Sequence, residues 1–224
     1  MELYEAMRTT FSAREFTTAP LPDDILYKIL EHARFAPNGG NRQGWHVIIV
    51  RDQATRQVLA RLTEPAAKRY AAQQQAGESP WNTIEPTKLD ADTIARTSVP
   101  DRLTEPIMTA AVVLIICVDL KMVASTDCEL DRVGVISGAS IYPFAWNIML
   151  AARHEGYGGN ITTLAIAQEP ELQRLLGIPP HVAVCAVMPM GQPVRQLTKL
   201  RRKAVMTFAT HERWDGQPLT HAKP

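Results

Sequence analysis

Apolar positions at helical spacing divide the N-terminal part of the chain into two short helices. The first residues predict an opening helix, because Leu3, Ala6 and Met7 fall on one face. A second helix is expected after Pro22, since a proline in the first turn followed by two aspartates suits a helix start. Its apolar residues recur as far as Ala33, and it should end before the next proline.

Short continuous apolar runs predict the strands of a central sheet. The predicted strands are residues 46–50, 110–118, 157–163 and 182–189. Further helices are expected at residues 53–62 and 169–176. Strands interleaved with helices, without a βαβ nucleotide fingerprint, favour an α+β fold over a doubly wound sheet. Because we find no internal repeat and no boundary, residues 1–224 are predicted to form one domain.

Two later segments differ in character from these elements. Residues 131–155 are apolar on most sides and predict a buried central helix, which Pro143 should kink or begin. The tail from residue 203 onward is polar, with isolated aromatics at Phe208 and Trp214. It has too little core to fold alone, so it is expected to be an arm.

Residues 64–106 are long, weakly patterned and interrupted by prolines. Such an insertion in a compact enzyme is often a lid or a substrate loop. It is expected to hold short helices and no core strand. Tyr70 and Trp81 are its isolated aromatics and are candidate substrate contacts. A surface excursion with no role is an equally good interpretation.

Composition and charge exclude several classes of function. The 24 basic and 23 acidic residues nearly balance, which argues against a nucleic-acid or membrane-surface role. The N-terminus is too polar for a signal peptide, and the longest apolar run is too short to span a bilayer. Cys117 and Cys185 lie in apolar runs and are expected to be buried thiols, which fits the reducing cytoplasm.

The candidate chemistry of this sequence is anion binding. No spacing of histidines and cysteines offers a metal site, and the glycines of 156–159 fail the dinucleotide fingerprint. Ser12 and Arg14 place a hydroxyl and a guanidinium two residues apart, which suits a phosphate. The glycine-rich turn at 36–45 can bring backbone N–H groups and amide side chains to a flat polar ring. Together these segments predict a phosphorylated ligand with a polar ring.

A second basic cluster follows the last predicted strand. A solvated basic loop is the usual interpretation of such a run. The alternative is that one or two of its members meet Arg14 on a shared phosphate. The cluster consists of Arg195, Lys199, Arg201, Arg202 and Lys203.

The order of these motifs resembles the nitroreductase family over almost the whole chain. Residues 7–16 resemble the family's first FMN-phosphate segment, and residues 36–45 resemble its Ala-Pro-Ser-Gly-Gly-Asn turn. Further matches, in the family's order, fall at residues 138–158, 160–164, 175–179, 190–193 and 200–203.

This resemblance implies an intertwined homodimer around a mixed or antiparallel sheet, with two FMN sites built from both subunits. Ser12 and Arg14 would bind the phosphate together with Arg202 and with Arg201 or Lys199. Thr10 belongs to the same segment, where relatives often carry arginine. The residues expected along the flavin ring, some from the partner subunit, are Pro37, Asn38, Gly39, Asn41 and Gln43. Thr162, Thr163 and Leu164 would pass its N5 and O4 atoms.

The resemblance also implies a reaction. Hydride would pass from NAD(P)H through FMN to a flat acceptor such as a nitroaromatic or a quinone, so no acid–base side chain is required. Reductive dehalogenation and flavin fragmentation on the same fold are alternatives. Glu64, Lys68 and Tyr70 lie in the region where dehalogenase relatives grip a zwitterion. A non-catalytic flavin-binding protein is the third hypothesis.

Overall fold

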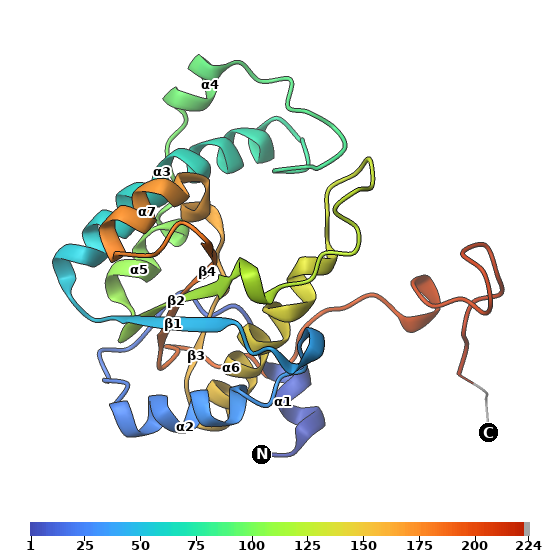
Figure 1. Ribbon diagram of the computed structural model, residues 1–224, viewed down its shortest axis with the longest axis horizontal. Helices are drawn as coiled ribbons and strands as arrows, with labels where there is room; N and C mark the ends of the chain where they lie inside the picture. The colour runs from blue at the N-terminus through green and yellow to red at the C-terminus, as the bar shows by residue number, and fades with distance from the viewer. Residues whose placement is uncertain (222–224) are drawn as a thin grey trace.

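The computed structural model describes residues 1–221 and is built around one four-stranded antiparallel sheet (Figure 1). The strands are β1 (Trp45–Val50), β2 (Val112–Asp119), β3 (Gly158–Gly159) and β4 (Val182–Gly191). Their order across the sheet is β1-β2-β4-β3, and all three pairings are antiparallel. Helices accompany the sheet, so the α+β prediction is confirmed and the sheet is antiparallel throughout.

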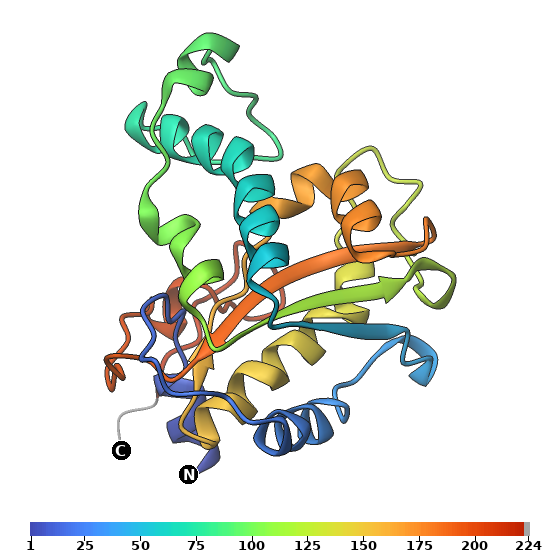
Figure 2. The same ribbon diagram turned by 90° about the vertical axis from the view of Figure 1, so that its left-hand side faces the viewer.

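The central strand β2 divides the core into two apolar clusters. Its residues from Val112 to Val118 are all buried, and successive side chains point to opposite faces, as strand geometry requires. Helices α2 (Asp23–Ala33) and α6 (Tyr142–His154) pack on one face, and α3 (Gln53–Gln75) and α7 (Glu169–Leu176) pack on the other. Figure 2 shows these helices on the two sides of the sheet.

The central apolar segment begins its α-helix later than residue 131. A 3-10 turn covers Ile136–Ser140, and α6 starts at Tyr142 with Pro143 in its first turn. A proline is tolerated there because the first N–H groups of a helix have no partner inside the helix. The expectation that Pro143 marks the start of the helix is therefore confirmed. The opening helix α1 spans Leu3–Thr9.

Two other predicted elements also have wrong boundaries. Helix α3 runs to Gln75 instead of ending at residue 62, although Pro65 lies inside it. The helix changes direction partway along its length (Figure 2), which is the usual effect of an internal proline. In the region 157–163, β3 covers only Gly158–Gly159, and Thr162 joins the sheet through a single bridge to Val187.

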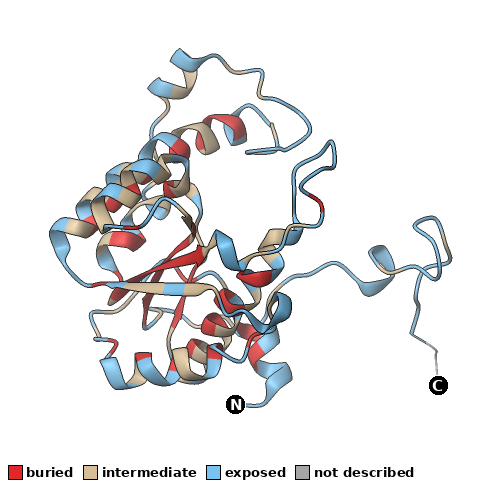
Figure 3. Ribbon diagram, in the orientation of Figure 1, coloured by how far each residue is buried: buried red, intermediate tan, exposed pale blue. Residues whose placement is uncertain are grey.

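The segment 64–106 begins with the second half of α3, and residues 76–104 then form a mostly exposed excursion above this helix (Figure 3). After α3 it contains an irregular loop over residues 76–90, then α4 (Ala91–Arg96), a 3-10 turn (Asp101–Leu103) and α5 (Glu105–Thr109). The expected short helices are present, and no strand occurs in this segment, all of which the structure describes.

The C-terminal segment leaves the body of the protein as an extended arm (Figures 1 and 3). A 3-10 turn at Val205–Thr207 is its one helical element within the described part. The Phe208 side chain is 68% exposed and the Trp214 side chain 99% exposed. No helix within residues 1–221 is long and apolar enough to cross a bilayer.

Candidate functional site

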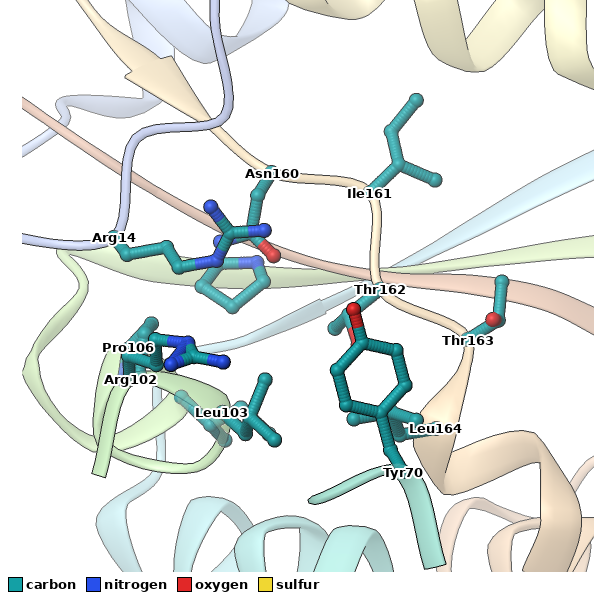
Figure 4. A pocket seen from close by; sticks show the side chains of 12 residues that line it. Arg14, Tyr70, Arg102, Leu103, Pro106, Asn160, Ile161, Thr162, Thr163 and Leu164 are labelled. Carbon is teal, nitrogen blue, oxygen red and sulfur yellow. The ribbon is translucent and has the colours of Figure 1, made fainter. Parts of the chain in front are cut away.

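A small cavity of about 170 Å³, which we call the basic cavity, lies beside β4 and the residues that follow β3. Figure 4 shows the guanidinium groups of Arg14 and Arg102 on one side of it and the phenol ring of Tyr70 on the other. Its lining residues are Arg14, Tyr70, Arg102, Leu103, Pro106, Ile107, Asn160, Ile161, Thr162, Thr163, Leu164 and Pro189.

Arg14 reaches the basic cavity because the chain before it is fixed to the sheet. Ser12 forms a parallel bridge with Gly159, and the backbone N–H of Ala13 donates to the Gly159 carbonyl at 2.8 Å. The buried Asn160 side chain donates to the Ala13 carbonyl at 3.0 Å. A Cβ on Gly159 would lie 2.5 Å from the backbone carbonyl oxygen of Pro189, so only glycine permits β3 to lie this close to β4.

Arg102 reaches the basic cavity from a different element, the 3-10 turn Asp101–Leu103 before α5. One of its N–H groups donates to the Gln74 amide oxygen at 3.2 Å. Neither Arg102 nor Arg14 forms an ion pair within residues 1–221. Two guanidinium groups without a carboxylate make the cavity attractive to an anion. The sequence analysis missed Arg102, because a lone arginine in a weakly patterned segment carries no local signal.

Residues 160–164 form a further wall of the basic cavity, and the last three of them are the ones that the sequence analysis placed along a flavin ring. Thr162 is held by paired backbone hydrogen bonds with Val187, at 3.0 and 2.8 Å. Thr163 precedes the 3-10 turn Leu164–Gln168 and supplies a carbonyl to Ile166. The predicted residues Thr162, Thr163 and Leu164 therefore share one cavity with Arg14.

A second cavity of about 630 Å³, the apolar cavity, adjoins the basic cavity. The two share Tyr70, Thr163 and Leu164, so the predicted substrate contacts Tyr70 and Trp81 line one continuous region. None of the side chains that line the apolar cavity is charged at neutral pH. They are Ala66, Tyr70, Pro80, Trp81, Tyr142, Thr163, Leu164, Ile166, Ala167, Val184 and Cys185.

The thiol that lines the apolar cavity is chemically inert. Cys185 is the extra residue of a β-bulge, since Ile116 pairs with Ala186 while Cys117 pairs with Val184. The Tyr142 hydroxyl donates to the carbonyl of this bulged residue at 3.3 Å. Burial raises the pKa of the Cys185 thiol to about 12, so the neutral thiol dominates at pH 7 and is a poor nucleophile.

The glycine-rich turn lies away from the basic cavity in this chain. The Asn38 side chain accepts from the Gln43 N–H at 2.8 Å, and Asn41 and Gln43 both adopt positive φ, at 52° and 53°. Such backbone is strained for residues other than glycine and is frequent at ligand sites. Gln43 lines a different cavity of about 560 Å³. The other predicted ring contacts, Pro37, Asn38, Gly39 and Asn41, line neither the basic nor the apolar cavity.

The C-terminal basic cluster also stands apart from Arg14. Lys199 and Arg202 line a fourth cavity of about 380 Å³ together with Arg8, whereas Arg201 does not line it. Thr10 is 3% exposed, and its hydroxyl donates to the Ala6 carbonyl. A single chain therefore holds two separate groups of cations, one around Arg14 and one around Lys199. Within residues 1–221 no cluster of three or more metal-ligating side chains is found.

The fold and the site define an α+β protein with an anion-attracting cavity beside an uncharged one. A sequence model of the Nitroreductase family matches residues 7–192. The chain belongs to the nitroreductase family, a class of oxidoreductases, which confirms the resemblance seen in the sequence.

Proteins of similar sequence carry several names. The chain is 26% identical over 193 residues to an "NADH dehydrogenase" of Thermus thermophilus, covering 83% of each protein. It is 24% identical over 206 residues to mouse "Iodotyrosine deiodinase 1", covering 91% of this chain and 67% of that one.

Solved structures resemble this one at low sequence identity. An oxidized iodotyrosine deiodinase bound to FMN and 3-iodo-L-tyrosine matches with a TM-score of 0.67 at 20% identity, covering 91% of this chain and 96% of that one. An NADPH:FMN oxidoreductase from Vibrio harveyi complexed with NAD+ matches with a TM-score of 0.64 at 20% identity, covering 97% and 79%. These likenesses establish the fold.

Proposed function

We propose that this protein is an FMN-dependent oxidoreductase that transfers hydride from NAD(P)H to a nitroaromatic, quinone or similar flat acceptor. The observation that carries the proposal is a cavity with two guanidinium groups that form no ion pair within residues 1–221, adjoining an uncharged aromatic cavity. An anionic cofactor suits the first and a flat acceptor suits the second. FMN and nicotinamide in the names of several relatives of the same fold add support.

The residues of the basic cavity fit a phosphorylated flavin. Arg14 and Arg102 would balance its negative charge, and the backbone of residues 160–164 would line its ring. When bound, FMN supplies the redox chemistry by accepting hydride and passing it on. The protein orients the ligands and excludes water, and no buried carboxylate or histidine lines either cavity to act as an acid or base.

We propose that the active form is a homodimer, because one chain does not gather all predicted contacts. The glycine-rich turn and the Lys199 cluster lie outside the basic cavity. The arm carries Phe208 and Trp214, both well exposed, and Trp146 of α6 is 40% exposed. Association of two chains would cover these apolar side chains and bring the turn of one chain to the cavity of the other.

Reductive dehalogenation is the second candidate, since several similar proteins are named iodotyrosine deiodinases. The structure supports dehalogenation less well than it supports the reductase proposal. Lys68 donates its ammonium hydrogen to the Ala95 carbonyl at 3.0 Å, and neither Lys68 nor Glu64 lines the basic or the apolar cavity. The charged pair that would grip an amino acid is therefore not assembled in this chain.

Cofactor analysis tests the proposal directly. The purified protein is expected to be yellow and to release FMN, not FAD, on denaturation. Either NADH or NADPH should bleach the flavin absorbance without oxygen, and adding a quinone or nitroarene should restore it. A colourless protein that FMN cannot reconstitute would refute the proposal. Bound FMN that neither nicotinamide bleaches would indicate a non-catalytic flavoprotein, and turnover of 3-iodo-L-tyrosine alone would indicate a dehalogenase.

A further inference from the structure

One buried amide side chain anchors the loop that covers the apolar cavity. Gln73 lies on the second half of α3 and is 1% exposed. Its Oε1 accepts a hydrogen bond from the backbone N–H of Trp81 at 3.1 Å, and its Nε2 donates to Glu78 at 3.1 Å. Both ends of the amide are therefore used, and both partners belong to the loop 76–90. A buried amide with both groups bonded fixes its partners, because losing either bond would leave a polar group unpaired.

Glu78 extends this anchoring to the far end of the loop. Its carboxylate accepts from the Thr87 hydroxyl at 2.6 Å and from the Lys88 backbone N–H at 2.8 Å. These hydrogen bonds, led by that of Thr87, hold the pKa of Glu78 below its usual value, so it remains ionised at pH 7. The Gln73 amide thus joins the loop to α3, and Glu78 ties the two ends of the loop together.

Trp81 is the residue that this chain of contacts holds at the cavity. It adopts a φ of +55°, a left-handed conformation that is unfavourable for a bulky side chain. Such a conformation persists only where the surroundings enforce it. The Arg69 guanidinium lies 4.2 Å from the centre of the indole ring, and its Nε is buried without a hydrogen-bond partner. Arg69 does not line the apolar cavity, whereas Trp81 does.

The side chains that line the apolar cavity favour an uncharged aromatic ligand. It presents three aromatic side chains, Tyr70, Trp81 and Tyr142, and no charged group. A flat ring gains contact by stacking on such side chains. A charged ring substituent would lose water and find no partner of opposite charge among the residues that line this cavity.

We propose that Trp81 is a specificity-determining residue that stacks on a neutral, planar acceptor, and that Gln73 is the positioning residue that holds it there. This inference rests on the proposed reductase function and adds the class of acceptor. It predicts that the enzyme reduces a neutral acceptor more efficiently than a charged acceptor of the same size and shape.

The first experiment compares 4-nitrobenzamide with 4-nitrobenzoate, which match closely in size and shape and differ in charge. Because the carboxylate also withdraws electrons less strongly than the carboxamide, the ratio of the two kcat/KM values is judged against the same ratio in Trp81→Ala. The neutral acceptor should show a kcat/KM about tenfold or more above that of the anion, because the anion must shed water in an uncharged cavity. Trp81→Ala should lower kcat/KM for the neutral acceptor by about tenfold, the value of one lost aromatic contact. Equal values for the two acceptors, or a preference for the anion, would overturn the proposed class.

The second experiment exploits the polarity of the Gln73–Glu78 hydrogen bond. Gln73→Glu places a carboxylate against ionised Glu78, and this repulsion should release Trp81 and raise KM for 4-nitrobenzamide by about tenfold. Adding Glu78→Gln reverses the donor and the acceptor at unchanged net charge and should restore KM to within about threefold. Gln75→Glu, on the exposed part of the same helix, is the matched charge control. A normal KM in Gln73→Glu, or no recovery in the double variant, would refute the role of Gln73.

A binding measurement separates this inference from the proposed function. Quenching of tryptophan fluorescence by 4-nitrobenzamide should be strong in the wild-type protein and clearly weaker in Trp81→Phe, before any nicotinamide is added. FMN content and flavin bleaching by NAD(P)H should be the same in all variants. If the flavin is absent or does not bleach, the reductase proposal fails. If it bleaches normally but Trp81→Phe quenches like the wild type, only the present inference fails.

Discussion

Two arginine side chains give the basic cavity its chemical character. Arg14 and Arg102 are 88 positions apart in the sequence, yet their guanidinium groups lie on the same side of one small cavity, whose lining residues include no carboxylate. The same residue type behaves differently elsewhere in the chain. Arg34 and Arg174 pair with glutamates one helical turn away, and those pairs are exposed and contribute little. An arginine that already pairs with a glutamate is less available to a ligand than one that faces no carboxylate.

Arg14→Ala is expected to weaken FMN binding by roughly 10- to 100-fold, taking about 1.5–3 kcal/mol for a charged hydrogen bond. Riboflavin, which lacks the phosphate, should bind the variant and the wild type equally. Equilibrium dialysis with both flavins makes the distinction, and Arg61→Ala on the exposed side of α3 is the control. Equal weakening of both flavins would show that Arg14 contacts the ring and that the phosphate belongs to another cation, such as Lys199 or Arg202.

At the scale of elements, the pattern of apolar residues predicts those helices and strands that are determined by their own residues. β2 and α2 follow from their own residues, since a buried run makes a central strand and a 3.6-residue repeat makes an amphipathic helix. The second half of α3 does not, because Pro65 carries a local penalty that tertiary packing offsets. That packing buries Ala66, Ala67, Ala71 and Ala72, whose small side chains give a weak apolar signal.

The residues of the candidate site likewise divide into those that short sequence motifs reveal and those whose roles depend on the assembled fold. Ser12, Arg14 and residues 162–164 could be proposed from short motifs, and the structure gathers Arg14 with 162–164. Arg102 and Gln73 could not, because their roles depend on partners elsewhere in the fold: the cavity wall for Arg102 and the 76–90 loop for Gln73. Their contacts become visible only when α3, the loop and the sheet are assembled.

The loop between β2 and α6 supplies a prediction at this scale. Asp127 is buried and accepts from Ser125, from Arg132 and from the N–H groups of Val135 and Ile136. These hydrogen bonds, led by that of Val135, hold the pKa of Asp127 well below its usual range. A lowered folded-state pKa means stabilisation that is complete above the unfolded-state pKa and lost as the pH falls towards the folded one.

Asp127→Asn should therefore lower the melting temperature by a constant amount at pH 7 and pH 5. The difference should shrink below about pH 4, where the carboxylate of the unfolded chain protonates. The variant should also be cleaved faster by trypsin after Arg132, since that side chain is released. Asp131→Asn, at an exposed neighbouring position, is the control. A melting difference that persists unchanged to pH 3 would contradict the assigned role of the charge.

At the scale of the whole molecule, the single chain leaves several large apolar side chains exposed to solvent. The arm carries exposed Phe208 and Trp214 away from the body (Figure 1), and α6 exposes Tyr142, which lines the apolar cavity, and Trp146, one helical turn further along. Large apolar groups gathered on such protruding parts are typical of stable dimer interfaces, which bury roughly 2,000 Å² or more. The separation of the two cationic groups within one chain is a second reason to expect a partner chain.

Light scattering should accordingly give about twice the mass of one chain for the flavin-loaded protein, as a two-fold dimer requires. Deleting the arm from residue 204 onward should shift the protein towards the monomer and lower flavin occupancy together, because a shared site cannot survive separation. Trp214→Ala should do the same more weakly. An arm-deleted monomer that keeps its FMN and its activity would show that one chain builds the whole site.

The attachment of the N-terminal segment to the sheet also dictates when the site can form. Ser12 pairs with Gly159, Thr17 donates to the Gln192 carbonyl, and Phe16 pairs with Pro193. The loop that these pairings close spans most of the chain, and the entropy lost in closing a loop grows with its length. Contacts so distant in sequence slow folding. During synthesis, therefore, the segment that carries Arg14 leaves the ribosome early but has nowhere to dock until β4 and the residues after it have emerged.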